Sequence, residues 1–228
     1  MSKYFSSLSI NIAGTDTPPL SESDVLELSC GPDGCDANCC ANGPPIVLNP
    51  YEISRICAAV DLTYEYLLDI VESGRAGGFP LIMLPRDPAC RFRTENGCRI
   101  YEARPLACRL FPLGRVFHNG RSHIVLPVRN RCAGLVHAPA STVADYLRDQ
   151  DTKISIEMAD RWIEFVSEME KWRFPDRPVT SIAFHMMVYQ PDAPSVLPQS
   201  DPAASLEERF LLRLAFARKE LPRFLIRA

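Results

Sequence analysis

Several features that would assign this chain to a common class of protein are missing from its sequence. No run of eighteen apolar residues occurs, so no membrane-spanning helix is expected. The N-terminal residues lack the long apolar core of a secretory signal, which favours a cytoplasmic protein. A glycine-rich nucleotide loop after a strand is also absent, which argues against a doubly wound pocket for S-adenosylmethionine. A Cys-x3-Cys-x2-Cys run of the radical type is absent too.

The sequence also lacks a strong overall charge. Its formal net charge is -3, so neither nucleic acid nor a membrane surface is an expected partner. The charge is unevenly placed, however. The stretch from Arg86 to Arg131 holds ten arginines and no lysine, against three acidic residues. This positive stretch also contains many of the cysteines.

Nine cysteines, an odd number, are a poor fit to a closed set of disulfides. In a reducing compartment, thiols stay reduced or bind metal. With 46% apolar residues, the chain can bury a core without cross-links. Metal ligation is therefore the better explanation for the cysteines.

Eight of the cysteines form two groups along the chain. One group lies in a loop rich in Gly, Asn, Asp and Pro, and the other lies in a strand-rich segment. Thiolate is a soft ligand, so zinc, copper(I) and iron-sulfur clusters are candidates and magnesium and calcium are not. Eight thiols suffice for two four-ligand sites, or for one cluster with spectators. The predicted metal ligands are Cys30, Cys35, Cys39 and Cys40 in the loop, and Cys90, Cys98, Cys108 and Cys132 in the strand-rich segment.

The arginine excess bears on the choice of metal. A cluster held by four thiolates is a net anion, and nearby arginines would offset its charge and donate hydrogen bonds to sulfur. We therefore favour an iron-sulfur cluster of the 4Fe-4S type, with zinc as the alternative. Alternatively, the arginines form a solvated face that pairs with carboxylates. Because neighbouring side chains usually diverge, Cys39 and Cys40 are not both expected to serve one site.

The pattern of elements predicts an α+β fold, in which helices pack on short hairpins around a small cysteine-rich, metal-centred domain, followed by a helical C-terminal part. A helix is expected after Asn49 as N-cap, with Pro50 at its first position, and another from Thr63 to Ser73-Gly74. Strands are expected at 79–84 and 91–101, and a hairpin at 115–126. Helices are expected at 152–172 and from Ser205, which opens a capping box. The predicted division is an N-terminal arm at 1–28, a metal-binding domain at 29–138 and a helical region at 139–228.

The cysteine spacing carries a resemblance to a known family. The order Cys-x4-Cys-x3-Cys-Cys, then Cys90-Arg-Phe and Gly97-Cys98-Arg-Ile-Tyr-Glu-Ala-Arg-Pro-Leu-Ala-Cys108-Arg-Leu-Phe-Pro, resembles the YkgJ-like cysteine-cluster family of zinc- or iron-chelating domains. The resemblance covers residues 30 to about 135. It implies that the cysteines are metal ligands, and it leaves the last ninety or so residues unmatched.

The resemblance does not fix an activity. One branch similar to this family methylates lysines of flagellin and is associated with an iron-sulfur centre, so redox, metal-handling and methyl-transfer roles all stay open, and so does whether the chain is an enzyme. A zinc-stabilised module that docks a protein partner through its C-terminal helices is an alternative, and a thiol enzyme is a third.

His137 is a further candidate zinc ligand. Cys57 lies on an apolar helical stripe and is expected to be buried and inert. We expect Arg104 and Arg109 either to flank the metal centre or to pair with carboxylates.

Overall fold

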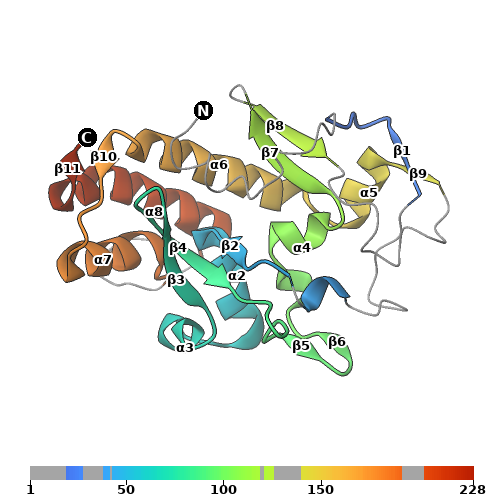
Figure 1. Ribbon diagram of the computed structural model, residues 1–228, viewed down its shortest axis with the longest axis horizontal. Coiled ribbons are helices and arrows are strands. Elements are labelled where there is room, and N and C mark those ends of the chain that lie inside the picture. Colours follow the sequence, from blue (N-terminus) through green and yellow to red (C-terminus); the bar gives the residue numbers. More distant parts are fainter. Residues whose placement is uncertain (1–18, 28–37, 42, 119–120, 126–139, 192–202) are drawn as a thin grey trace. The chain divides into compact units, whose positions relative to one another are not determined.

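The fold is described from a computed structural model (Figure 1). It describes residues 19–27, 38–41, 43–118, 121–125, 140–191 and 203–228. The elements confirm the α+β class, with short antiparallel hairpins and helices concentrated after residue 140. The contacts divide the chain into two compact units, which we call unit one (9–46 and 85–156) and unit two (47–84 and 157–228). The predicted division at residues 28 and 138 stays a prediction.

Unit one is built mainly from two-stranded antiparallel pairs. Strand β1 pairs with β9, β5 with β6, and β7 with β8. Helix α5 begins with a capping box, in which Thr142 and Asp145 exchange side-chain and backbone hydrogen bonds. Its elements are β1 (Val25–Leu26), η1 (Asn38–Cys40), β5 (Arg93–Thr94), β6 (Gly97–Cys98), η2 (Tyr101–Ala103), α4 (Leu106–Leu110), β7 (Gly114–His118), β8 (Arg121–Val125), β9 (Ser141–Thr142) and α5 (Val143–Asp149).

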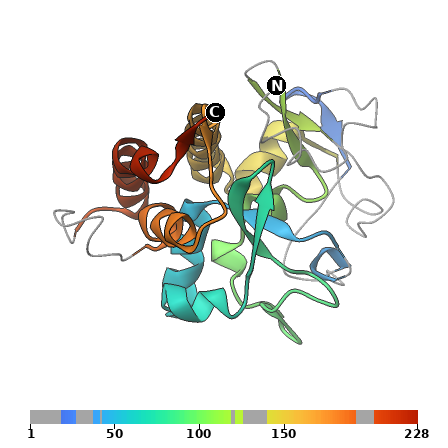
Figure 2. The ribbon, with the colours of Figure 1, turned by 60° about the vertical axis from the view of Figure 1, so that its left-hand side comes forward.

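Unit two combines a three-stranded sheet, in the order β2-β4-β3, with helices (Figure 2). Strand β2 begins at the boundary between the units, and α6 also crosses that boundary. Its elements are β2 (Ile46–Leu48), α2 (Pro50–Val60), α3 (Tyr64–Leu68), β3 (Glu72–Ala76), β4 (Phe79–Leu84), α6 (Lys153–Met169), β10 (Trp172–Arg173), α7 (Pro178–Phe184), the π-helix η4 (His185–Tyr189), α8 (Leu206–Glu220), η5 (Leu221–Phe224) and β11 (Ile226–Arg227).

The predicted helix starts are confirmed, because their signals are local. Asn49 and Glu52 form a capping box around Pro50, and Ser205 does the same with Glu208. The end predicted for the second helix is wrong: α3 ends at Leu68 instead of Ser73-Gly74. Residues 72–76 form a strand because Gly77 and Gly78, both at positive φ, make the two-residue turn of a hairpin with β4.

Aromatic side chains form the core of unit two. Phe79 on β4 is fully buried, and its ring lies 5.9 Å from Trp162, 5.1 Å from Phe174 and 5.3 Å from Phe184. The first of these partners comes from α6, and the other two come from α7 and the segment before it. This cluster therefore holds the β3–β4 hairpin to the helices of the unit.

None of the described helices has the length and apolar character needed to cross a membrane.

We expect Phe79→Ala to lower the free energy of unfolding of unit two by about 3–5 kcal/mol, because the cavity removes edge-to-face contacts as well as apolar area. Both tryptophans, Trp162 and Trp172, lie in this unit, so urea unfolding followed by tryptophan fluorescence measures the effect. Ile182→Ala, at a side chain that is 58% exposed, is the control and should change stability by less than about 0.5 kcal/mol. Similar losses in the two variants would contradict the assigned core.

Candidate metal centre

The candidate metal centre lies in unit one, where backbone pairing joins the two groups of cysteines. The backbone N–H of Cys90 donates to the carbonyl of Cys40 at 2.7 Å, and Ala41 and Ala89 form an antiparallel bridge. Cys39 and Cys40 end the short helix η1, while Cys90 precedes the β5–β6 hairpin. Segments about fifty residues apart in the sequence therefore meet at their cysteines.

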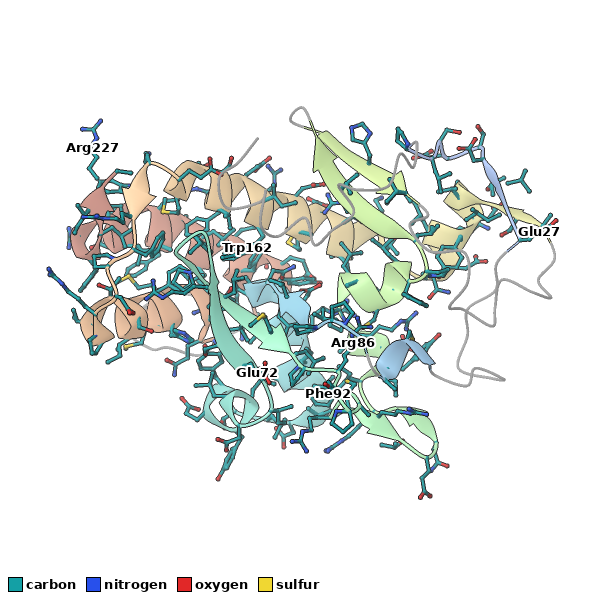
Figure 3. All side chains as sticks on the ribbon, viewed as in Figure 1. Glu27, Glu72, Arg86, Phe92, Trp162 and Arg227 are labelled. Carbon is teal, nitrogen blue, oxygen red and sulfur yellow. The ribbon has the colours of Figure 1, made fainter. Side chains whose placement is uncertain are left out.

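Arg86 fastens the same junction with its side chain. Its guanidinium donates to the carbonyl of Pro44 at 2.8 Å and to that of Cys39 at 2.5 Å (Figure 3). Gly43 makes this approach possible, because a Cβ at that position would lie 2.6 Å from the Cζ atom of Arg86. The guanidinium also brings a positive charge to the thiols: it contributes to the lowered pKa of Cys40 and opposes the rise in the pKa of Cys90 and Cys108.

Two further elements position Cys98 and Cys108. Cys98 lies on β6 opposite Arg93, and Cys108 lies in the middle of α4. The two thiols interact electrostatically with each other and with those of Cys40 and Cys90. None of these four thiols is in a disulfide.

Burial and mutual charge raise the pKa of three of the thiols. For Cys90, Cys98 and Cys108 the largest cause is burial, and the neighbouring sulfurs add to it. Backbone N–H groups oppose this effect: those of Phe92 and Arg93 favour the Cys90 thiolate, and that of Ile100 favours the Cys98 thiolate. Hydrogen bonds of this kind to sulfur tune metal-bound thiolates and stabilise their charge.

Cys40 differs from the other three thiols. The neighbouring thiol of Cys39, 3.9 Å away, lowers the pKa of Cys40 from 9.0 to about 6, and Arg93 and Arg86 contribute to the shift. The expected divergence of Cys39 and Cys40 is therefore not observed, since the turn of η1 keeps both sulfurs on one side. Their separation is close to the roughly 3.8 Å between two sulfurs on one tetrahedral zinc ion, given Zn–S bonds of about 2.3 Å.

The donor chemistry of this site fits a soft metal. The side chains at this site that could bind a metal are thiols, and the charged side chains near them are arginines. Within the described ranges, no three His, Cys, Asp or Glu side chains are grouped closely enough to hold a metal ion. Of the predicted ligands, Cys30, Cys35 and Cys132 lie outside the described residues, as does His137. The ligand set as a whole stays a prediction.

A buried arginine supports the helix that carries Cys108. The side chain of Arg109 is 1% exposed and donates to the carbonyls of Glu102, Arg104, Gln150 and Asp151, at 2.5–3.2 Å. It also lies 3.7 Å from the carboxylate of Asp151. The role of Arg109 is thus to fix α4 against the end of α5, and the expected carboxylate pairing is a minor part of it.

Arg104 lies near the thiol of Cys98, and its hydrogen-bond acceptors among the described residues are a carbonyl and an amide instead of the expected carboxylate. Its guanidinium stacks 3.8 Å above the ring of Tyr101 and donates to the carbonyl of that residue and to the side chain of Gln150, both at 2.7 Å. Its charge also opposes the rise that burial causes in the pKa of Cys98. Sequence reasoning did not single out Arg86 from the other arginines of its stretch, and it missed Gly43 and the backbone donors, since these act through contacts between distant segments. Cys57 is buried on α2 in unit two, as expected.

Comparison with protein families supports the metal-binding interpretation of this region. Residues 29–133 match the family model CxxCxxCC, described as "Putative zinc- or iron-chelating domain". The searches of curated proteins and of solved structures found no match to the chain. The match covers every predicted ligand, and it ends before α5.

We expect Arg109→Met to lower the free energy of unfolding by about 3–5 kcal/mol, because four carbonyls, two of them in buried hydrogen bonds, lose their donor while the side-chain volume is kept. Calorimetry measures the loss, and hydrogen exchange should show faster exchange at the amides of α4. Arg148→Met is the control, because that side chain is 71% exposed and pairs only at the surface. Unchanged exchange in α4 would contradict the role given to Arg109.

In the metal-free protein, alkylation of Cys40 by iodoacetamide should rise with a midpoint near pH 6. Because the folded-state pKa is lowered, the stabilisation from the thiolate is complete above pH 9 and is lost as the pH falls through about 6. Cys98, whose pKa is raised, should react only above pH 9. Mass spectrometry of the labelled peptides measures both. Cys39→Ala should move the Cys40 midpoint upward, and an unmoved midpoint would contradict the assigned cause.

Proposed function

Because the chain carries a domain of the cysteine-cluster, metal-chelating family over residues 29–133, we propose that this metal-binding protein holds an iron-sulfur cluster in that domain. The ligands are drawn from Cys39, Cys40, Cys90, Cys98 and Cys108, together with the predicted Cys30, Cys35 and Cys132. When bound, a cluster of the 4Fe-4S type supplies one-electron redox chemistry. The role that follows is redox, metal handling or methyl transfer, in the cytoplasm.

One observation carries the proposal: backbone pairing of two distant segments joins Cys90 to Cys40, in a region whose nearby charged side chains are arginines. The charges of Arg86 and Arg93 favour the thiolate of Cys40, and that of Arg104 favours the thiolate of Cys98. Such charges offset the net negative charge of a cluster held by four thiolates, as they also would for zinc, and hydrogen bonds to the cluster's sulfurs raise its reduction potential. The backbone donors at Phe92 and Ile100 supply such bonds.

A zinc-stabilised interaction module is the second candidate function. It is favoured by exposed apolar side chains on α8, where Leu211 and Leu212 are 39% and 50% exposed. These two leucines line a shallow groove with three alanines, which suits a protein partner better than a polar ligand. In this case zinc would stabilise unit one, and the helices of unit two would bind the partner.

Purification without oxygen, followed by elemental analysis and visible spectroscopy, separates the two functions. We expect stoichiometric iron and a brown protein whose charge-transfer absorption bleaches on reduction. Cys98→Ala and Cys108→Ala should each lose most of the iron and the colour, because each removes a thiolate ligand. Cys57→Ala is the matched control and should keep both, since Cys57 lies in unit two. A colourless protein with tightly bound zinc would favour the module, and neither metal would refute both functions.

A further inference from the structure

A polar pocket of about 400 Å³ lies in unit two, away from every predicted metal ligand in the sequence. It is lined by the β3–β4 hairpin, by the segment before α7, and by α7 and η4. Its volume falls within the range of small-molecule sites. The polar residues that line it are Ser73, Arg75, Asp176, Arg177, Ser181 and His185.

The charge of this pocket is positive. The guanidinium of Arg75 donates to the carbonyl of Gly78 at 3.0 Å and lies 3.2 Å from the carboxylate of Asp176, so this pair is nearly neutral. Arg177 is exposed, and in the described part of the chain no carboxylate lies within ion-pair distance of it. Its charge is therefore available to a ligand of opposite sign.

His185 is held in one orientation at the wall of the pocket. The hydroxyl of Tyr64 lies 2.8 Å from Nδ1 of His185. Burial raises the pKa of Tyr64, so this phenol keeps its proton and donates a hydrogen bond to Nδ1. Burial also lowers the pKa of His185, so the imidazole is neutral and its remaining proton lies on Nε2. The imidazole, which lines the pocket, thus carries one N–H donor that Tyr64 does not engage.

The hydrogen-bond donors of this pocket therefore all favour a ligand with negatively charged oxygen atoms. The guanidinium of Arg177, the Nε2–H of His185 and the hydroxyls of Ser73 and Ser181 all donate hydrogen bonds, while Asp176 is engaged by Arg75. Pro80 and Pro178 add an apolar wall. Oxygen anions take such charge-assisted donors, and a planar guanidinium fits both carboxylate and phosphate.

We propose that this pocket binds a small molecule through an oxyanion group, a carboxylate or a phosphate ester, with Arg177 and His185 as its main contacts. The proposal goes beyond the metal centre and does not depend on it, because all the lining residues belong to unit two. Tyr64 is a positioning residue, which acts by fixing the imidazole of His185.

The test is an NMR titration of the full chain with inorganic phosphate and, separately, with acetate, at constant ionic strength maintained with sodium chloride. We expect saturable shifts of the His185 imidazole nitrogens with at least one anion. Saturation by phosphate alone would assign the site to phosphate esters, and saturation by acetate alone to carboxylates. Arg177→Gln should weaken binding about tenfold, the typical loss with one charge-assisted contact.

Two further variants keep the test decisive. Arg173→Gln removes an exposed arginine that does not line the pocket, and it should leave binding unchanged. Tyr64→Phe should weaken binding and abolish the single Nε2–H tautomer in the nitrogen spectrum, an effect that a purely structural role would not produce. No saturable shift at His185 with either anion, or equal weakening by Arg173→Gln and Arg177→Gln, would overturn the proposal. Iron content should be unchanged in Arg177→Gln, so the outcome is separable from that for the metal centre.

Discussion

The hydrogen bond from the Cys90 amide to the Cys40 carbonyl is the interaction on which the candidate centre depends. It joins two short segments that have little secondary structure of their own. Arg86 reinforces the junction by donating to the carbonyls of Cys39 and Pro44. These bonds and the Ala41–Ala89 bridge hold the two segments together, since the described residues around the cysteines fold only into a short 3-10 helix and two-residue strands.

Polar contacts of two arginines support the segment that carries Cys108. Arg109, a buried residue of α4, donates hydrogen bonds to four carbonyls, and the guanidinium of Arg104 stacks on the ring of Tyr101. Arg104 and Arg109 therefore support the segment that carries Cys108. Their role is to position the cysteine and not to bind a metal themselves. Support of this kind suits a metal site, because ligands need fixed positions and few elements in unit one can supply a large apolar core.

The arginines of the chain serve distinct purposes that their number alone does not reveal. Some lower the pKa of thiols, as Arg86 and Arg93 do, while Arg109 serves as a buried hydrogen-bond donor. In unit two, Arg177 belongs to a pocket unrelated to the cysteines. That unit takes its stability from the aromatic core around Phe79, which leaves its surface pocket free to carry a different chemistry.

The sequence by itself determined the match of residues 29–133 to a cysteine-cluster family, the α+β class and the starts of the helices, because capping residues such as Asn49 and Ser205 and the cysteine spacing act over a few residues. It also determined that Cys57 is buried, through its place on an apolar stripe. Only the tertiary structure decided that the segments of Cys40 and Cys90 pair, that Cys39 and Cys40 do not diverge, and that residues 72–76 form a strand. These features rest on contacts between residues far apart in the chain, and no local pattern records which distant carbonyl or guanidinium will be the neighbour.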